Sequence, residues 1–299
     1  QLLVFDGCYH GAVDDTLVDR DPSSGATLRR PSVLGQVHNH HAFTRVVPFN
    51  DLAALEAALS DGQVACLLAE PAMTNIGMVL PEPGFWEAAQ ALCRRYGTLL
   101  LIDETHTIST GPGGYTRAHG LQPDLLVLGK PVAGGVPCAV YGFSAEAAAR
   151  AEAAKRNAPP GHSGIGTTLS ANLLTMAAMR ANLAEVMTDA AYAHMFTLAT
   201  RLADGLRAMI ARHGLGWCVT QIGARTEFQF TPTPPRNGSE ADRILNPALE
   251  QNIHLYLLNR GLVITPFHNM MLVCPDTTAD DVDRLVAGME AFVVDTIAP

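Results

Sequence analysis

The stretch PDLLVLGKPVAGGVP, residues 123–137, joins an apolar run to a lysine and then to a glycine-rich turn. Residues 125–128 have the continuous hydrophobicity of a buried β-strand, and Lys130 follows at the carboxyl end of that strand. Lysine is rare in this chain, since Lys130 and Lys155 are the only lysines among 20 basic residues. A lysine amine, unlike a guanidinium group, can lose its proton when it is desolvated and then attack a carbonyl carbon. The stretch therefore indicates a reactive lysine beside a buried strand.

Apolar runs and amphipathic helical patterns alternate around this stretch. The helical pattern of residues 51–62 begins with Asp51 as a capping residue, and that of residues 84–97 ends at a glycine. Continuous apolar strands that alternate with such helices are typical of a mostly parallel sheet covered by helices on both faces. We therefore predict an α/β fold, with strands within residues 1–5, 64–71, 98–104, 124–130 and 139–144.

The pattern changes in the last third of the chain. After helical patterns at residues 170–187 and 193–214, we expect strands within residues 226–234, 262–267 and 270–275, with helices at 246–261 and 278–295. This mixture predicts a large domain over residues 1–190 and a small C-terminal α+β domain over residues 191–299. Because the chain opens inside an apparent strand, we expect the N-terminal part of the large domain to lie upstream of Gln1.

The composition argues against several classes of protein. A net charge of −9 without a basic cluster argues against nucleic acid as a partner, and no apolar run has the length of a membrane span. The six cysteines are scattered, which indicates reduced thiols in a cytoplasmic protein. His38, His40 and His41 lie close together, but no second ligand group of matching spacing accompanies them, so we expect no metal site.

Charged side chains follow two of the predicted strands directly. Asp103 and Glu104 end the run LLLIDE, and Lys130 ends the run LLVLGK. Ligands of open α/β sheets bind at the carboxyl ends of the strands. A Schiff-base lysine and an aspartate together fit pyridoxal phosphate, whose ring nitrogen needs a carboxylate partner. By these residues alone, a buried Asp–Lys ion pair remains the alternative.

Several longer motifs occur together in this order: GCYHG at residues 7–11, AEPAMTNIGMVLPEPGFWEAA at 69–89, LLLIDET, PDLLVLGKPVAGGVPCAVYG and GTTLSAN. In this combination the chain resembles the class III aminotransferases, which depend on pyridoxal phosphate and have fold type I, and most of all their glutamate-1-semialdehyde 2,1-aminomutase branch. The resemblance covers essentially the whole chain. It implies pyridoxal 5'-phosphate as cofactor and at least a homodimer whose active sites are shared between subunits.

The resemblance also implies roles for the residues around the cofactor. Lys130 matches the lysine that forms the Schiff base, and Asp103 matches the partner of the ring nitrogen. Tyr9 matches an aromatic residue that stacks on one face of the ring, and Thr105 should pack under the other face. Asn75 is expected near the phenolic oxygen of the cofactor. A core tyrosine is the alternative for Tyr9.

Other positions are assigned through the same resemblance. His10 should support the cofactor wall, and Thr168 should reach the cofactor phosphate of the neighbouring subunit, unless it only caps a helix. Arg225 is the candidate cation for a substrate carboxylate, with a surface arginine as the alternative. His106 and His268 are candidate substrate contacts. The family's phosphate-binding loop has no counterpart in this sequence and should lie upstream.

The predicted function is that of an aminotransferase, which moves an amino group between an amino acid or amine and an oxo acid through Lys130. The alternatives on the same scaffold are an aminomutase of the glutamate-1-semialdehyde type or an amino-acid epimerase or racemase. A Rossmann-type nucleotide-binding protein is disfavoured, because no GxGxxG turn follows a strand. A non-catalytic dimer that kept the scaffold remains a further alternative.

Overall fold

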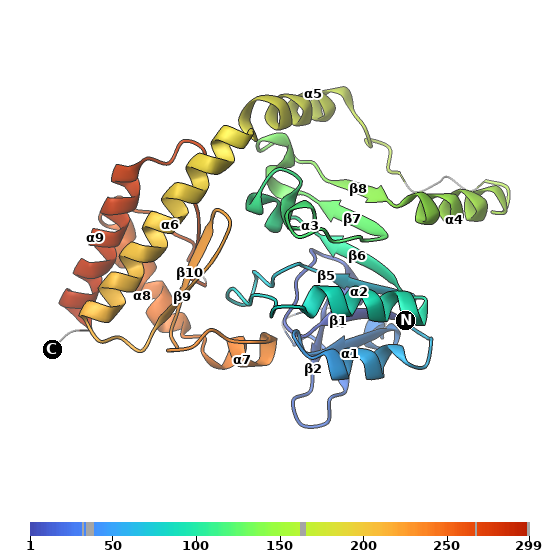
Figure 1. The fold of residues 1–299 in the computed structure, drawn as a ribbon, viewed down its shortest axis with the longest axis horizontal. Helices are drawn as coiled ribbons and strands as arrows, with labels where there is room; N and C mark the ends of the chain where they lie inside the picture. The colour runs from blue at the N-terminus through green and yellow to red at the C-terminus, as the bar shows by residue number, and fades with distance from the viewer. Residues whose placement is uncertain (32, 34–38, 162–165, 267, 298–299) are drawn as a thin grey trace.

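A six-stranded sheet forms the centre of the first part of the chain (Figure 1). The computed structural model describes residues 1–31, 33, 39–161, 166–266 and 268–297. All neighbouring strands pair in parallel except the last pair, which is antiparallel. The predicted α/β fold with a mostly parallel sheet is thus confirmed. In spatial order the strands are β4 (Thr44–Val47), β1 (Leu2–Phe5), β5 (Cys66–Ala69), β6 (Leu99–Asp103), β7 (Leu125–Leu128) and β8 (Val140–Phe143).

The apolar side chains of this sheet form a core with helices α1 (Leu52–Leu59) and α2 (Phe85–Tyr96). Asp51 caps α1 by accepting a hydrogen bond from the amide of Ala54, as its position in the sequence predicts. Four aromatic rings contact one another at the centre of this core, mostly edge to face and with centroids 4.9 to 6.4 Å apart, and they belong to Phe5, Phe49, Phe85 and Trp86. This packing fixes the strands whose ends carry the site.

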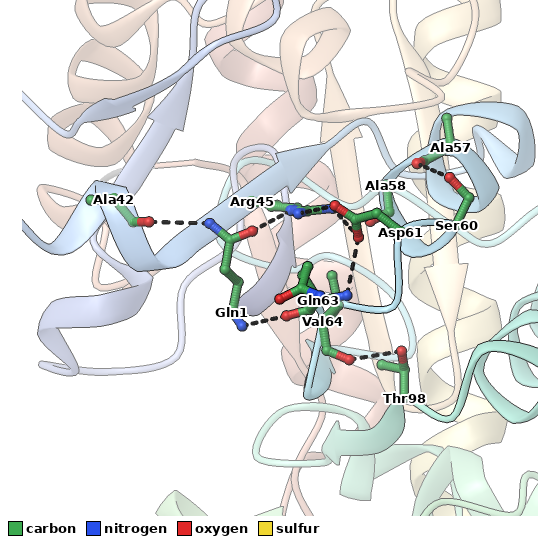
Figure 2. A network of polar contacts seen from close by, with 10 residues as sticks. All are labelled: Gln1, Ala42, Arg45, Ala57, Ala58, Ser60, Asp61, Gln63, Val64 and Thr98. Atoms are coloured by element: carbon green, nitrogen blue, oxygen red, sulfur yellow. Dashed lines mark hydrogen bonds and ion pairs between the residues drawn. The ribbon is translucent and has the colours of Figure 1, made fainter.

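Arg45 on strand β4 joins the edge of the sheet to the end of α1 (Figure 2). Its guanidinium group binds both carboxylate oxygens of Asp61, at 3.0 and 2.6 Å, and donates to the carbonyl of Ala58. It also donates to the side chain of Gln1. A bidentate ion pair fixes the direction of the contact as well as its distance. Arg45 therefore holds the C-terminal end of α1 against strand β4 and the residue that precedes β1.

A second sheet carries the C-terminal part of the chain (Figure 1). Its strands β9 (Cys218–Ile222), β10 (Arg225–Gln229) and β11 (Met270–Leu272) are antiparallel, with β10 in the middle. Helices α6 (Asp189–Arg212), α8 (Pro247–Leu258) and α9 (Ala279–Thr296) share an apolar core with this sheet. In chain order, the buried residues of this second core begin at Tyr192. The predicted boundary between the two domains, at residues 190 and 191, stays a prediction.

The predicted strand at residues 262–267 is wrong for residues 262–266, which form no strand. The backbone groups of this segment bind the end of helix α8 instead of a neighbouring strand. Leu262 donates its amide to the carbonyl of Leu257, and the carbonyl of Ile264 contacts the ring of His254 at 2.9 Å. Phe267 lies outside the described residues. An apolar run indicates that a segment is buried. It becomes a strand only where a neighbouring strand offers unpaired backbone groups for hydrogen bonding.

Helix α7 (Gly238–Arg243) brings the C-terminal part of the chain against the end of β1. A Cβ atom at Gly238 would lie 2.0 Å from the carbonyl oxygen of Asp6, so only glycine permits this contact. Ser239 also donates a hydrogen bond to the carboxylate of Asp6. The remaining elements are η1 (Asp14–Thr16), β2 (Val18–Arg20), β3 (Thr27–Arg29), η2 (His40–Phe43), η3 (Thr107–Thr110), α3 (Gly114–Ala118), η4 (Lys130–Ala133), α4 (Ala145–Arg156), α5 (Leu173–Ala181) and η5 (Asn182–Val186).

Among the residues that the structure describes, none of the helices combines the length and the hydrophobicity that crossing a bilayer requires.

Candidate active site

Lys130 follows β7 in a strained backbone conformation. Its φ of 44° lies in the left-handed region, which residues with a side chain rarely adopt. A 3₁₀ turn, η4, begins at this residue, and Pro131 continues it. Desolvation lowers the pKa of the Lys130 amine, although Asp103 and Glu70 act in the opposite direction. The strained turn thus places an amine that gives up its proton more easily than a free lysine.

The two carboxylates at the end of β6 point to opposite sides, as consecutive residues of a strand do. Asp103 accepts a hydrogen bond from the amide of Thr105 at 3.0 Å and contacts His10 Nδ1 at 2.9 Å. Glu104 faces away and accepts hydrogen bonds from the amides of Tyr115 and Thr116 in α3. Asp103 therefore belongs to the candidate site, whereas Glu104 anchors a helix.

His10 and Asp103 form a buried ion pair, with side-chain exposures of 2% and 10%. Burial acts to lower the pKa of His10, but the hydrogen bond with Asp103 and the nearby Cys8 and Glu70 outweigh it and raise this pKa to about 10. Burial acts to raise the pKa of Asp103, but the hydrogen bonds from His10 and Thr105 bring it below its ordinary value. Asp103 is therefore a carboxylate at neutral pH, and His10 is its charged partner.

The raised pKa of His10 predicts a pH-dependent contribution to stability. A cation whose pKa rises on folding stabilises the protein fully below its unfolded pKa of 6.5, and this contribution is lost as the pH rises to about 10. Denaturant unfolding of the wild type and of His10→Gln, measured across this range, should show a stability difference that shrinks with increasing pH. A difference that stays constant from pH 6.5 to 10 would contradict the charged pair.

Two adjoining cavities lie at the carboxyl ends of the sheet strands. The smaller one, of about 300 Å³, is lined by charged and polar residues from the ends of β1, β5, β6 and β7. The larger one, of about 820 Å³, extends toward the small sheet. Tyr9, Asn75, His106 and Lys130 line both cavities, so the reactive amine stands where they meet. The remaining residues around the smaller cavity are His10, Gly11, Glu70, Asp103 and Thr105.

The structure therefore brings together seven of the predicted site residues around one small cavity, and these are Tyr9, His10, Asn75, Asp103, Thr105, His106 and Lys130. His268 lines the larger cavity with Lys130 and His106. Burial and the neighbouring Arg225 lower the pKa of His268 to about 4, which keeps its ring neutral. The roles that the sequence predicts for these residues stay predictions, but their proximity is what those roles require.

Arg225 takes a position that its prediction did not anticipate. It is buried, with 5% of its surface exposed, and its Nε donates to the carbonyl of His106 and to Ser109 Oγ, both at 3.0 Å. Its Nη1 contacts Met270 Sδ at 3.3 Å. Burial lowers its pKa to about 10, and within the described part of the chain it forms no ion pair. Arg225 thus stabilises the loop that begins at His106 through these hydrogen bonds.

Thr168 does not line either cavity, and the histidine cluster cannot be placed relative to them. Thr168 is exposed, next to a turn in which the amide of Thr167 donates to Ser170 Oγ at 2.8 Å. Its predicted contact would come from a second subunit and stays a prediction. His38 lies outside the described residues, as do the side chains of His40 and His41.

Sequence reasoning missed three residues of the site. Glu70 and Thr74 belong to the AEPAMTNIG motif, and Glu70 directly follows strand β5. The same strand-end argument that selected Asp103 would have selected Glu70. Arg30 lines the larger cavity and donates hydrogen bonds to Asp19 and to the carbonyl of Cys8, but in the sequence it belongs only to an isolated basic pair.

Comparison with known proteins identifies the family. The family model described as Aminotransferase class-III matches residues 1–293. The chain belongs to the class III aminotransferase family. This confirms the resemblance predicted from the sequence, and the cofactor of this family is pyridoxal phosphate, as expected.

Relatives within the class III family include glutamate-1-semialdehyde 2,1-aminomutases. The chain is 36% identical to that of an Anaeromyxobacter species over 243 residues, which cover 80% of this chain and 55% of the relative. It is 34% identical to the aminomutase of Sorangium cellulosum over 290 residues, which cover 96% of this chain and 64% of the relative. The chain therefore spans about 55 to 64% of the length of these curated relatives.

Solved structures agree with these sequence relatives. The crystal structure of a glutamate-1-semialdehyde-aminomutase from Pseudomonas aeruginosa, a Lys-to-Ala variant in complex with PMP, is 48% identical, with a TM-score of 0.94 over 99% of this chain and 66% of that chain. An omega-transaminase from Sphaerobacter thermophilus is 26% identical, with a TM-score of 0.85 over 99% and 68%. These relatives favour the aminomutase alternative over the aminotransferase that the sequence analysis put first.

Proposed function

We propose that this chain is the core of a pyridoxal-phosphate-dependent aminomutase that moves an amino group between carbons 2 and 1 of glutamate 1-semialdehyde. The observation that carries the proposal is the meeting of Lys130 and ionised Asp103 at one cavity, in a chain related to aminomutases. Bound pyridoxal phosphate supplies an aldehyde for amines and an electron sink for the substrate carbon.

The residues of the smaller cavity fit this cofactor. Asp103 uses one oxygen for Thr105 and the other for His10, and a carboxylate has further lone pairs with which to accept a bond from a protonated ring nitrogen. Tyr9 offers an aromatic face at the same cavity, and Lys130 offers the amine. We propose that Asn75 and Thr105 complete this pocket and that Thr168 acts in a neighbouring subunit of a homodimer.

The larger cavity is proposed to hold the substrate. His268 and His106 present neutral rings there, and Arg30, which binds Asp19, lines the same cavity. Arg225 lies behind this cavity, where its Nε binds His106 and Ser109 and its Nη1 contacts Met270. We therefore propose that Arg30, which lines this cavity, binds the substrate carboxylate, and the predicted contact of Arg225 with the substrate stays a prediction.

Product analysis tests this function directly. The holoenzyme, given glutamate 1-semialdehyde and no oxo acid, should form the isomer with the amino group on carbon 1 in repeated turnovers. An aminotransferase would stop after one amino group per active site and would resume only when an external oxo acid is added. That second result would reject the aminomutase proposal and restore the aminotransferase.

A further inference from the structure

Glu70 is a buried carboxylate that the proposed function leaves without a task. It directly follows strand β5, and only 5% of its surface is exposed. Burial raises its pKa, and Asp103 acts in the same direction, whereas His10 and its hydrogen-bond donors oppose them. Its Oε2 accepts a hydrogen bond from Thr74 Oγ1 at 2.5 Å. A buried carboxyl group in this setting holds a proton more readily than an exposed glutamate does.

Thr74 connects Glu70 to the wall of the cavities. Its side chain is fully buried, and the same Oγ1 that contacts Glu70 also contacts Nδ1 of His106. A hydroxyl group has one proton to donate, so it serves only one of these two partners as a donor. If Glu70 is ionised, Thr74 donates to Glu70 and His106 must donate from Nδ1. If Glu70 is protonated, Glu70 donates to Thr74 and Thr74 donates to Nδ1.

His106 ends this chain of contacts at the boundary between the two cavities. Burial lowers the pKa of His106 to about 3, and the charges of Arg225 and Lys130 contribute to the decrease. Its ring is therefore neutral and carries its one proton on either Nδ1 or Nε2. Within the described residues, Nε2 has no hydrogen-bond partner. The state of Glu70 thus decides whether Nε2 is a proton donor or an acceptor.

We propose that Glu70, Thr74 and His106 form a proton relay that exchanges a proton between the buried carboxyl group and an oxygen or nitrogen atom of the substrate. When Nε2 takes up a proton, the proton on Nδ1 passes to Thr74 Oγ1 and the hydroxyl proton of Thr74 passes to Glu70 Oε2. The reverse sequence returns it. The imidazole is neutral before and after, and the charge of Glu70 changes from −1 to 0.

The relay rests on the proposed function and gives it a second acid–base group. The exchange of an amino group for a carbonyl oxygen releases water, so the departing oxygen must receive a proton. Lys130 is the only lysine at the cavities, and His268 faces Glu227 instead, with Nδ1 at 3.8 Å from Oε1. The charged and titratable groups that face Glu70 are His10, Asp103, Lys130 and Arg225. Those that face His106 are Arg225, Lys130, Asp103 and His268.

Nitrogen-15 NMR of the histidine rings in the holoenzyme tests the relay without substrate. We expect the ring of His106, assigned by its loss in His106→Gln, to stay neutral between about pH 5 and pH 9. Its proton should move from Nε2 at low pH to Nδ1 at high pH as Glu70 ionises. Glu70→Gln should abolish this pH dependence. A single tautomer throughout, or a ring that becomes charged in this range, would overturn the proposal even if the enzyme is an aminomutase.

Kinetics of Thr74→Val complete the test. Removal of the hydroxyl should lower kcat by about 10² to 10⁴-fold with little change in KM. Thr74→Ser should restore most of the rate and the change of tautomer. Thr98→Val is the matched control, because Thr98 also buries a hydroxyl, which donates to the carbonyl of Val64 at 2.9 Å away from both cavities. Equal losses in Thr74→Val and Thr98→Val would show that only packing is affected and would overturn the relay.

Discussion

Replacing Lys130 with alanine is expected to abolish covalent retention of pyridoxal phosphate and to lower kcat by at least about 10⁴-fold. The physical reason is that no other amine stands at the meeting of the two cavities. Borohydride reduction of the wild-type holoenzyme, followed by peptide mapping, should attach the cofactor to the peptide that contains Lys130. The variant should yield no labelled peptide.

Lys155 provides a matched control for this experiment. It is the other lysine of the chain and lies exposed on helix α4. Lys155→Ala should keep both the labelled peptide and the wild-type rate. If the label appears at Lys155, or if Lys130→Ala retains the rate, the proposed chemistry at Lys130 is wrong.

Asp103→Asn is expected to have the second largest effect, a decrease in kcat on the order of 10³-fold. An amide has the size of the carboxyl group but no charge, so it cannot keep a proton on the ring nitrogen of the cofactor. The same change removes the main interaction that raises the pKa of His10. NMR titration of His10 should therefore find its pKa well below the value of about 10 of the wild type.

Glu104→Gln distinguishes a role in the site from a general effect of removing a carboxylate there. Glu104 neighbours Asp103 in the sequence but accepts hydrogen bonds from the amides of helix α3. We expect this variant to lose about 1 to 3 kcal/mol of stability and to keep its cofactor spectrum and kcat. If Asp103→Asn and Glu104→Gln have equal effects on kcat, the special role of Asp103 is refuted.

Local patterns in the sequence were sufficient for the elements that carry the site. Asp51 caps α1 and Gly97 ends α2 as predicted, Asp103 is the last residue of β6, and Lys130 follows β7. These features depend on hydrogen bonds and side-chain burial within a few residues, which periodicity reports directly. The strand predicted at residues 262–267 was wrong because its formation depends on a distant partner edge, which no local pattern reports.

The site itself shows the same division. The sequence by itself determined that a lysine and an aspartate stand at the carboxyl ends of two apolar parallel strands, because apolar runs and chain order specify those ends. Only the tertiary structure decided that Glu70, Thr74 and His106 meet and that Arg225 stabilises the loop that begins at His106. These contacts join residues up to 119 positions apart, and they arise from the adjacency of β5 and β6 and from the docking of β10. Such distances are set by packing of the whole core, so the spacing of residues along the chain does not contain them.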